Sequence, residues 1–212
     1  MKMQITEIFK SIQGESSFAG VPCSFIRTTG CNLRCVWCDT EYAFYGGTAM
    51  SIAEILEAIE PHQCELVEIT GGEPLLQPDV PELCEELLRR KHTVLVETSG
   101  ALDISVLPKE AIKIMDIKCP ESGMLEKMDW QNVSRLSPKD EIKFVINSRA
   151  DYDWAVDILH RYQLHTQNLV LFSPVFEKMP PDQLAEWILA DRLPVRFQVQ
   201  LHKVLWGETP GR

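Results

Sequence analysis

Apolar and polar positions follow two alternating patterns along this chain. Short apolar runs rich in valine and isoleucine end in small polar loops, and most precede a segment in which apolar residues recur every third or fourth position. The runs predict strands, and the more widely spaced segments predict amphipathic helices. Strands that alternate with helices are typical of parallel sheets with helical crossovers.

The predicted strands number about seven and span residues 22–29, 65–70, 92–98, 112–118, 141–147, 168–172 and 195–202. Residues 4–9 alternate only weakly before a polar turn at 11–15, so we expect a surface loop there. These elements are too few for a closed eightfold barrel of roughly 250 residues. We therefore predict an α/β fold, an open partial (β/α) barrel with mostly parallel strands, in a single domain over residues 1–212.

Helix-start signals precede the predicted helices. Ser51 and Glu54 have the spacing of a capping box, and Pro61 ends that helix. The same spacing recurs at 79–82 and at 148–151. The helix that starts at 148 is predicted to continue to about residue 162. Residues 182–189 form a further predicted helix, and residues 129–136 a short one.

Composition and charge exclude several classes of function. The 212 residues include 45% hydrophobic and 25% charged residues, typical of a globular protein, and carry a formal net charge of −10. This charge disfavours nucleic acid as a partner, because acidic surfaces repel phosphates. No apolar run approaches the roughly eighteen residues of a membrane span, and the chain does not start with an apolar leader. We expect a cytoplasmic protein with no membrane or nucleic-acid partner.

Three cysteines lie in the segment G-C-N-L-R-C-V-W-C-D-T at residues 30–40. Cys31, Cys35 and Cys38 have the spacing C-x3-C-x2-C. Each thiolate can bind one iron of a cubic 4Fe-4S cluster, whereas saturating the cube takes four thiolates. The fourth iron is then open to a small chelating ligand. The spacing therefore predicts a cluster with one accessible iron.

Three other interpretations of these cysteines fit the sequence less well. A structural zinc site needs four ligands in paired spacings, and the nearest histidine, His62, is far along the chain. A disulfide framework needs an oxidising compartment. Cysteines clustered in a core do not fit a loop made polar by Asn32, Arg34 and Asp39. We expect the remaining cysteines to be structural, as small buried hydrophobes: Cys23, Cys64, Cys84 and Cys119.

Small and polar residues follow several predicted strands, at 70–74, 97–100, 116–118 and 173–176. Because the carboxyl ends of parallel strands share one edge of a sheet, we expect these loops and the cysteine segment to form one pocket. Gly71 and Gly72 allow backbone to approach a ligand closely, or simply form a tight turn. Arg27 is a single charge in an apolar run, and it either reaches solvent or binds an anion.

Together these motifs resemble the 7-carboxy-7-deazaguanine synthase family, within the radical SAM (S-adenosylmethionine) superfamily. The resemblance runs from about Ile5 to His202, and Trp37 fits the superfamily's aromatic position before the third cysteine. It rests on Gln13-Gly14-Glu15, Gly20 with Pro22, Arg27, Gly30-Cys31-Asn32-Leu33, Cys38-Asp39-Thr40, Thr70-Gly71-Gly72-Glu73-Pro74, Glu97-Thr98-Ser99-Gly100 and His202-Lys203.

The resemblance implies a lyase that converts 6-carboxy-5,6,7,8-tetrahydropterin to 7-carboxy-7-deazaguanine with loss of ammonia, on the route to queuosine and other 7-deazapurines. It implies a 4Fe-4S cluster, SAM and Mg2+ as cofactors. A 5'-deoxyadenosyl radical would abstract the C6 hydrogen of the pterin. The resemblance also implies a homodimer, an open partial barrel of the radical SAM type and a flavodoxin-type electron donor.

The resemblance also implies roles for individual residues. Cys31, Cys35 and Cys38 would bind the cluster, and Thr40 would bind Mg2+. Glu15 and Asp39 are candidates for proton transfer. The residues expected at SAM are Trp37, Cys38, Asp39, Gly72, Asp116, Ile117, Lys118, Ser173, Pro174, Val175 and Phe176. Those expected at the substrate are Ile12, Gln13, Gly14, Arg27, Thr70 and His202.

Two other functions compete with this one. A glycyl-radical enzyme activase is similarly small, but its cluster loop usually continues Cys-His-Asn, whereas Asp39 and Thr40 follow Cys38 here. A non-catalytic iron–sulfur, electron-transfer or zinc protein would not need an open iron site or the glycine pair at 71–72.

Overall fold

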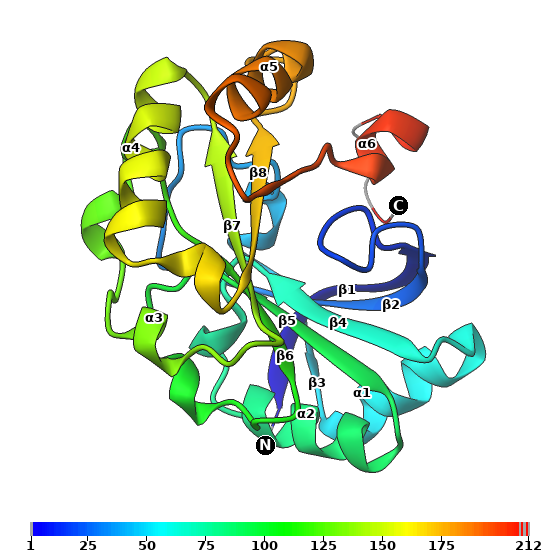
Figure 1. The fold of residues 1–212 in the computed structure, drawn as a ribbon. Coiled ribbons are helices and arrows are strands. Elements are labelled where there is room, and N and C mark those ends of the chain that lie inside the picture. Colours follow the sequence, from blue (N-terminus) through cyan, green and yellow to red (C-terminus); the bar gives the residue numbers. More distant parts are fainter. Residues whose placement is uncertain (1, 208, 210, 212) are drawn as a thin grey trace.

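A single curved sheet of nine strands organises the computed structural model, which describes residues 2–207, 209 and 211 (Figure 1). The strand order is β3-β1-β2-β4-β5-β6-β7-β8-β9. Strand β1 is antiparallel to both β2 and β3, and every pair from β2–β4 to β8–β9 is parallel. The chain thus forms an open, mostly parallel α/β half-barrel, and this predicted fold is confirmed.

The bounds of the strands follow the sequence order. They are β1 (Met3–Ile12), β2 (Pro22–Thr28), β3 (Thr48–Met50), β4 (Leu66–Gly71), β5 (Thr93–Thr98), β6 (Ile112–Asp116), β7 (Glu141–Ile146), β8 (Leu169–Pro174) and β9 (Arg196–Phe197). The helices are α1 (Ile52–Ile59), α2 (Val80–Arg89), α3 (Asn132–Arg135), α4 (Arg149–Arg161), α5 (Pro181–Asp191) and α6 (Leu201–Trp206).

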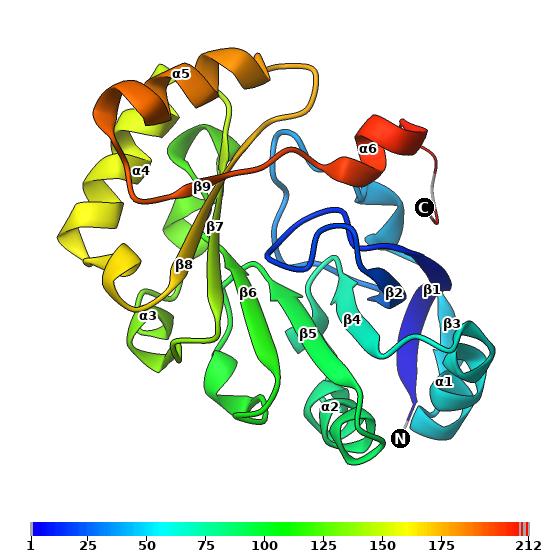
Figure 2. The ribbon, with the colours of Figure 1, turned by 45° about the vertical axis from the view of Figure 1, so that its right-hand side comes forward.

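Helices cover the outer face of the sheet (Figure 2). One apolar cluster packs α1 and α2 against β1, β2, β4 and β5, and another packs α4 and α5 against β6, β7 and β8. A smaller cluster lies on the opposite, inner face, where Phe25, Leu95 and Ile114 belong to β2, β5 and β6. The inner face is apolar at this level, so the polar cavity described below lies toward the carboxyl ends of the strands. Among the described residues, no helix combines the length and apolarity needed to cross a membrane.

The helix-start signals have different outcomes. Ser51 and Glu54 form the predicted capping box in both directions at the start of α1. The hydroxyl of Ser148 accepts a hydrogen bond from the Asp151 amide at the start of α4. Each such cap stabilises its helix by about 1 kcal/mol. The predicted cap at Asp79 is wrong, because its side chain makes no capping hydrogen bond and Pro81 occupies the first turn instead.

Two predicted elements are wrong, and one strand was missed. Residues 4–9 are not a surface loop but part of the ten-residue strand β1, which pairs with two neighbours. The strand predicted over 195–202 is reduced to β9, and its end belongs to α6 instead. Strand β3 was not predicted. Pairing with strands from elsewhere in the chain decides the structure of these segments, and local alternation does not reveal it.

The loop between β1 and β2 reaches across to the other side of the sheet. The Ser17 amide and hydroxyl both donate to the carboxylate of Glu141, the first residue of β7. The Leu201 amide of α6 donates to the Gly14 carbonyl at 2.9 Å. This loop therefore links the first strands of the sheet to its last segments and brings residues 13–15 to the cavity.

Candidate active site

A cavity of about 640 Å³ gathers most of the predicted site residues. Its wall includes Ile12, Gln13, Gly14, Glu15, Arg27, Cys31, Cys35, Trp37, Cys38, Asp39, Thr40, Thr70, Gly72, Asp116, Lys118, Val175, Phe176 and His202. Three predicted residues do not line it. Ile117 is fully buried, and Ser173 and Pro174 lie within β8, where they pair with β7.

The cysteine segment is held at the cavity by backbone contacts from three other segments. The Gly30 amide donates to the Ala43 carbonyl, the Glu73 amide donates to the Gly30 carbonyl, both at 2.8 Å, and the Val36 amide donates to Ser122. All three predicted cluster cysteines are free thiols, partly buried on the wall. Burial raises the pKa of the Cys35 and Cys38 thiols, and the neighbouring cysteines add to this effect. Lys118 lowers the pKa of both thiols and partly offsets this effect.

The donor set fits a cubic cluster. Cys31, Cys35 and Cys38 all lie on the cavity wall, within eight residues of one another. Each cysteine of a 4Fe-4S cluster binds a different iron, and saturating the cube takes four thiolates. Cys31, Cys35 and Cys38 would therefore hold the cluster and leave one iron without a protein ligand.

Gly72 shows why the turn after β4 contains glycine. A Cβ atom at residue 72 would lie 2.3 Å from the Gly30 carbonyl oxygen and 2.7 Å from the Cys31 Cβ. The glycine thus lets this turn pack directly against the cysteine segment. The next residue, Glu73, is fully buried and accepts hydrogen bonds from the Thr98 hydroxyl and the Ser99 amide. Glu73 consequently fixes the loops after β4 and β5 to each other.

A buried lysine connects the loop after β1 to the centre of the sheet. Lys143 of β7 forms an ion pair with Glu15 at 2.9 Å and a second one with Glu97 of β5. Burial favours the neutral amine, but Glu15, Glu97 and Asp116 raise the pKa of Lys143 well above its usual value. Burial also opposes the charge of Glu97, yet the Lys143 ammonium lowers the pKa of this carboxyl. The sequence analysis did not assign Lys143 to the site.

Arg27 is oriented by two other residues. Its Nε donates to Glu7 at 2.7 Å, and the Tyr42 hydroxyl donates to the same carboxylate oxygen at 2.8 Å. Burial disfavours its charge, but Tyr42 and Glu7 raise the pKa of Arg27. Burial raises the pKa of Tyr42 to about 12, so this hydroxyl remains a donor. The Arg27 side chain lines the cavity as a fixed cation suited to a carboxylate.

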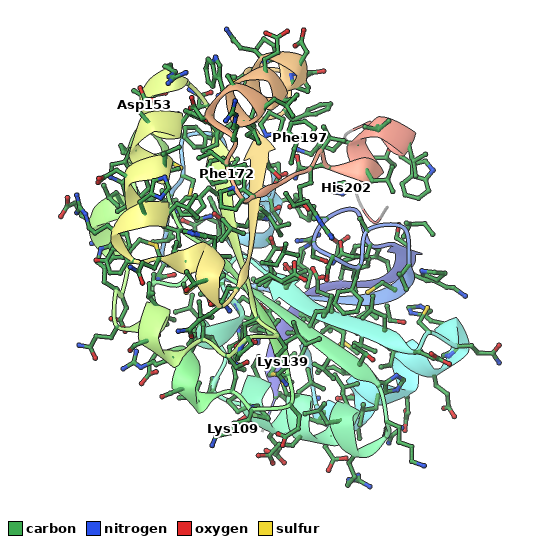
Figure 3. All side chains as sticks on the ribbon, viewed as in Figure 1. Lys109, Lys139, Asp153, Phe172, Phe197 and His202 are labelled. Carbon is green, nitrogen blue, oxygen red and sulfur yellow. The ribbon has the colours of Figure 1, made fainter. Side chains whose placement is uncertain are left out.

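Helix α6 is tied to the cysteine segment. Lys203 forms an ion pair with Asp39 at 2.8 Å, and the Thr40 hydroxyl donates to the same carboxylate, also at 2.8 Å. Desolvation opposes the charge of Asp39, but the Lys203 ammonium strongly lowers the pKa of this carboxyl. The imidazole of His202 lies directly against Gly14, where α6 meets the loop after β1 (Figure 3). Burial lowers the pKa of His202, which favours its neutral form.

The oxygen and the nitrogen of the Gln13 side-chain amide both form hydrogen bonds. Its Oε1 accepts a hydrogen bond from the Glu15 amide at 2.9 Å, and its Nε2 donates to the carboxylate of Glu68. Sequence reasoning missed Glu68 and Gln200, both of which line the cavity. The available signal was the strand period, which places Glu68 and Thr70 on the same face of β4.

Comparison with known proteins defines the class first. The sequence matches the Radical SAM superfamily over residues 25–189, and the three cysteines lie inside that match. The sequence is 45% identical to the 7-carboxy-7-deazaguanine synthase of Koribacter versatilis, covering 99% of this chain and 100% of that relative. It is 44% identical to the enzyme of that name from Chlorobaculum tepidum, covering 97% and 94%. The chain therefore belongs to the 7-carboxy-7-deazaguanine synthase family of the radical SAM superfamily.

Solved structures agree with the fold. The crystal structure of QueE from Escherichia coli superposes with a TM-score of 0.80 at 24% identity and covers 95% of both chains. Streptococcus suis SuiB bound to S-adenosylmethionine superposes with a TM-score of 0.54 at 17% identity, covering 81% of this chain and 48% of SuiB. At these identities the likeness concerns the fold alone.

Proposed function

We propose that this chain is the radical SAM lyase that converts 6-carboxy-5,6,7,8-tetrahydropterin to 7-carboxy-7-deazaguanine with loss of ammonia. The names of its relatives support this substrate. The proposal depends mainly on two features that lie on the same cavity wall. They are the three cysteines, which would leave one iron of a cluster open, and the fixed cation Arg27.

Cys31, Cys35 and Cys38 would hold the cluster. SAM would lie along residues 37–39 and Gly72, with Asp116, Lys118, Val175 and Phe176 around it. When bound, these cofactors supply a carbon-centred radical that removes a hydrogen atom from the substrate. Asp116 and Lys118 form an ion pair at 2.7 Å, which would give that part of the wall a fixed geometry. For Ile117, Ser173 and Pro174 we propose only an indirect role behind the wall.

The chain's own residues would then orient the substrate and exclude water. Arg27 would bind its carboxylate, while Gly14, Ile12, Thr70 and His202 would surround the ring. Fixing the reacting carbon matters most, because the first step needs no strong acid or base. Both oxygens of Glu15 are occupied, by Lys143 and by Gln200, and Asp39 is paired with Lys203. These contacts favour orienting roles over proton transfer for the two carboxylates.

Thr40 would bind Mg2+. A hydroxyl oxygen is a weak but hard donor, suitable for an ion that keeps water and substrate oxygens as its other ligands. Asp39 accepts the Thr40 hydroxyl hydrogen bond and so would direct the lone pairs of that oxygen.

The remaining proposals concern the whole protein. We propose that residues 1–212 form one domain, since one sheet extends through the described residues. We also propose that the protein is a homodimer, works in the cytoplasm and receives electrons from a flavodoxin-type donor. The free thiols throughout the described chain are compatible with a reducing compartment.

A direct test uses anaerobically reconstituted protein supplied with SAM, a reductant, Mg2+ and the carboxypterin. Mass spectrometry should detect 7-carboxy-7-deazaguanine. If the protein cleaves SAM but forms no deazaguanine, the proposed substrate is wrong. Light scattering of the same preparation gives the oligomeric state, and omitting Mg2+ with and without Thr40→Ala tests the metal.

A further inference from the structure

Apart from the exposed Glu177, one carboxylate of the cavity wall differs from the others in having no paired cation in the described part of the chain. Glu15 and Glu97 share Lys143, Asp116 pairs with Lys118, and Asp39 pairs with Lys203. Glu68 is 3% exposed and also lines the cavity. Within residues 2–207, 209 and 211, no cation forms an ion pair with Glu68, and the amide of Gln13 is its hydrogen-bond donor. One carboxyl oxygen of Glu68 is left for a ligand.

The position of Glu68 in the sheet makes the lack of a paired cation more unusual. In the register, Glu68 of β4 lies between Phe25 of β2 and Leu95 of β5, in the apolar layer of the inner face. Burying a carboxyl among apolar groups costs free energy unless donors reach it. Burial, together with Glu97 and Glu15, raises the pKa of Glu68 well above its usual value. A carboxyl in this layer is therefore unfavourable for the free protein, and donors on a bound ligand would offset its cost.

The depth of Glu68 relative to Arg27 suggests which part of a ligand it meets. Arg27 pairs in register with Thr70, so Glu68 lies two residues deeper along the same face of β4. Two residues of strand correspond to about 6–7 Å. A flat bicyclic ring held by its carboxylate at Arg27 would thus direct its opposite edge toward Glu68. The stacked rings of Phe9 and Phe25, with centroids 4.9 Å apart, form an apolar wall beside this path.

We propose that Glu68 is the specificity-determining residue for the amino-pyrimidine edge of the substrate, accepting hydrogen bonds from the exocyclic 2-amino group and the adjacent ring N–H. This inference rests on the proposed carboxypterin substrate. Gln13, whose amide is used at both ends, is then a positioning residue that orients Glu68. An ionised carboxylate offers about four acceptor positions. Gln13 uses one of them, so Glu68 can still accept from both N–H groups of the ligand.

The test compares two ligands and three variants in the anaerobically reconstituted holoenzyme. The ligands are the carboxypterin and its 2-desamino analogue, in which hydrogen replaces the amino group. The variants are Glu68→Ala, the isosteric Glu68→Gln and the control Glu65→Gln, which changes an exposed glutamate just before the same strand. Calorimetry measures binding of each ligand, and steady-state kinetics separates KM from kcat.

We expect Glu68→Ala to weaken carboxypterin binding by about 10- to 100-fold. Binding of the desamino analogue, which keeps the ring N–H but lacks the amino group, should weaken by only about three- to tenfold. The effect should appear in KM more than in kcat, with Glu68→Gln intermediate and Glu65→Gln unchanged. Equal losses for both ligands, or no loss for either, would overturn the assignment of Glu68. If the unmodified protein cleaves SAM but neither binds nor converts the carboxypterin, the proposed function fails and this inference fails with it. Iron content and thermal unfolding of Glu68→Gln identify any variant that has lost its fold.

Discussion

Lys143 and Glu15 form an ion pair at 2.9 Å that joins β7 to the loop after β1. Both side chains are largely buried, and Lys143 holds Glu97 with the same ammonium. The loop that carries Gln13 and Gly14 is therefore fixed to the far side of the half-barrel by charge, in addition to the hydrogen bond from Leu201. The substrate side of the cavity depends on this link.

Replacing Lys143 with methionine should destabilise the protein by about 3 kcal/mol. Methionine fills a similar space, but it leaves the carboxylates of Glu15 and Glu97 buried without a cation. The free energy of unfolding can be measured in urea on the apoprotein, with the exposed Lys139→Met as control. A loss below about 1 kcal/mol would mean that water or the Glu15 loop rearranges to solvate the two acids.

Alanine substitutions of the cluster cysteines and of a core cysteine should have different effects on iron content and stability. Alanine at Cys31, Cys35 or Cys38 should remove the cluster, so iron per chain and the visible absorbance both fall. Alanine at the fully buried Cys84 should keep the cluster and lower stability by about 1 kcal/mol, because α2 loses packing volume. Reconstitution followed by iron analysis and thermal melting separates the two classes. Full iron content in a Cys35→Ala variant would contradict the assignment.

Gly72→Ala should displace the cysteine segment. The added Cβ would overlap the Gly30 carbonyl at 2.3 Å, and backbone atoms cannot swing aside as a flexible side chain can. Gly20→Ala is the matched control: its φ of +93° strains an alanine, but no atom lies within 4 Å of the new Cβ. We expect both variants to melt at lower temperature, and only Gly72→Ala to lose iron after reconstitution. Equal iron contents would show that the contact between the β4 turn and the cysteine segment is dispensable.

The sequence reveals the loops around the cavity better than it reveals the strand residues that line it. Loops after parallel strands converge by topology, so the cysteines, Thr70 and Gly72 could be placed together before the structure was known. Glu68 and Lys143 were missed, because strands buried on both faces lack an alternation that shows which side chains point inward. For Glu68, the two-residue strand period counted from Thr70 was the one available signal. His202 was predicted by resemblance and lies on the cavity wall, but in helix α6 and not in the predicted strand. The helix that carries it is held by Gly14 and Asp39, which are remote in sequence.

Ionisation of Glu68 should make the protein less stable as pH rises, whereas ionisation of an ion-paired acid makes a protein more stable. Its pKa is raised in the folded protein, by burial first and then by Glu97 and Glu15, while Lys143 and Arg27 partly counteract this. Above the unfolded pKa of about 4.3, the unfolded chain ionises residue 68 more readily than the native protein does, so stability falls as pH rises toward the folded value.

Glu68→Gln removes this titration and keeps an acceptor for the Gln13 amide. The variant should gain melting temperature relative to the natural chain as pH rises from about 5.5 to about 8.5, since the penalty grows over that interval. Glu65→Gln, exposed to solvent, should show no such trend. A gain at pH 5.5 that shrinks toward 8.5 would mean that Glu68 is stabilised as a carboxylate, with a donor beyond Gln13 reaching it in solution.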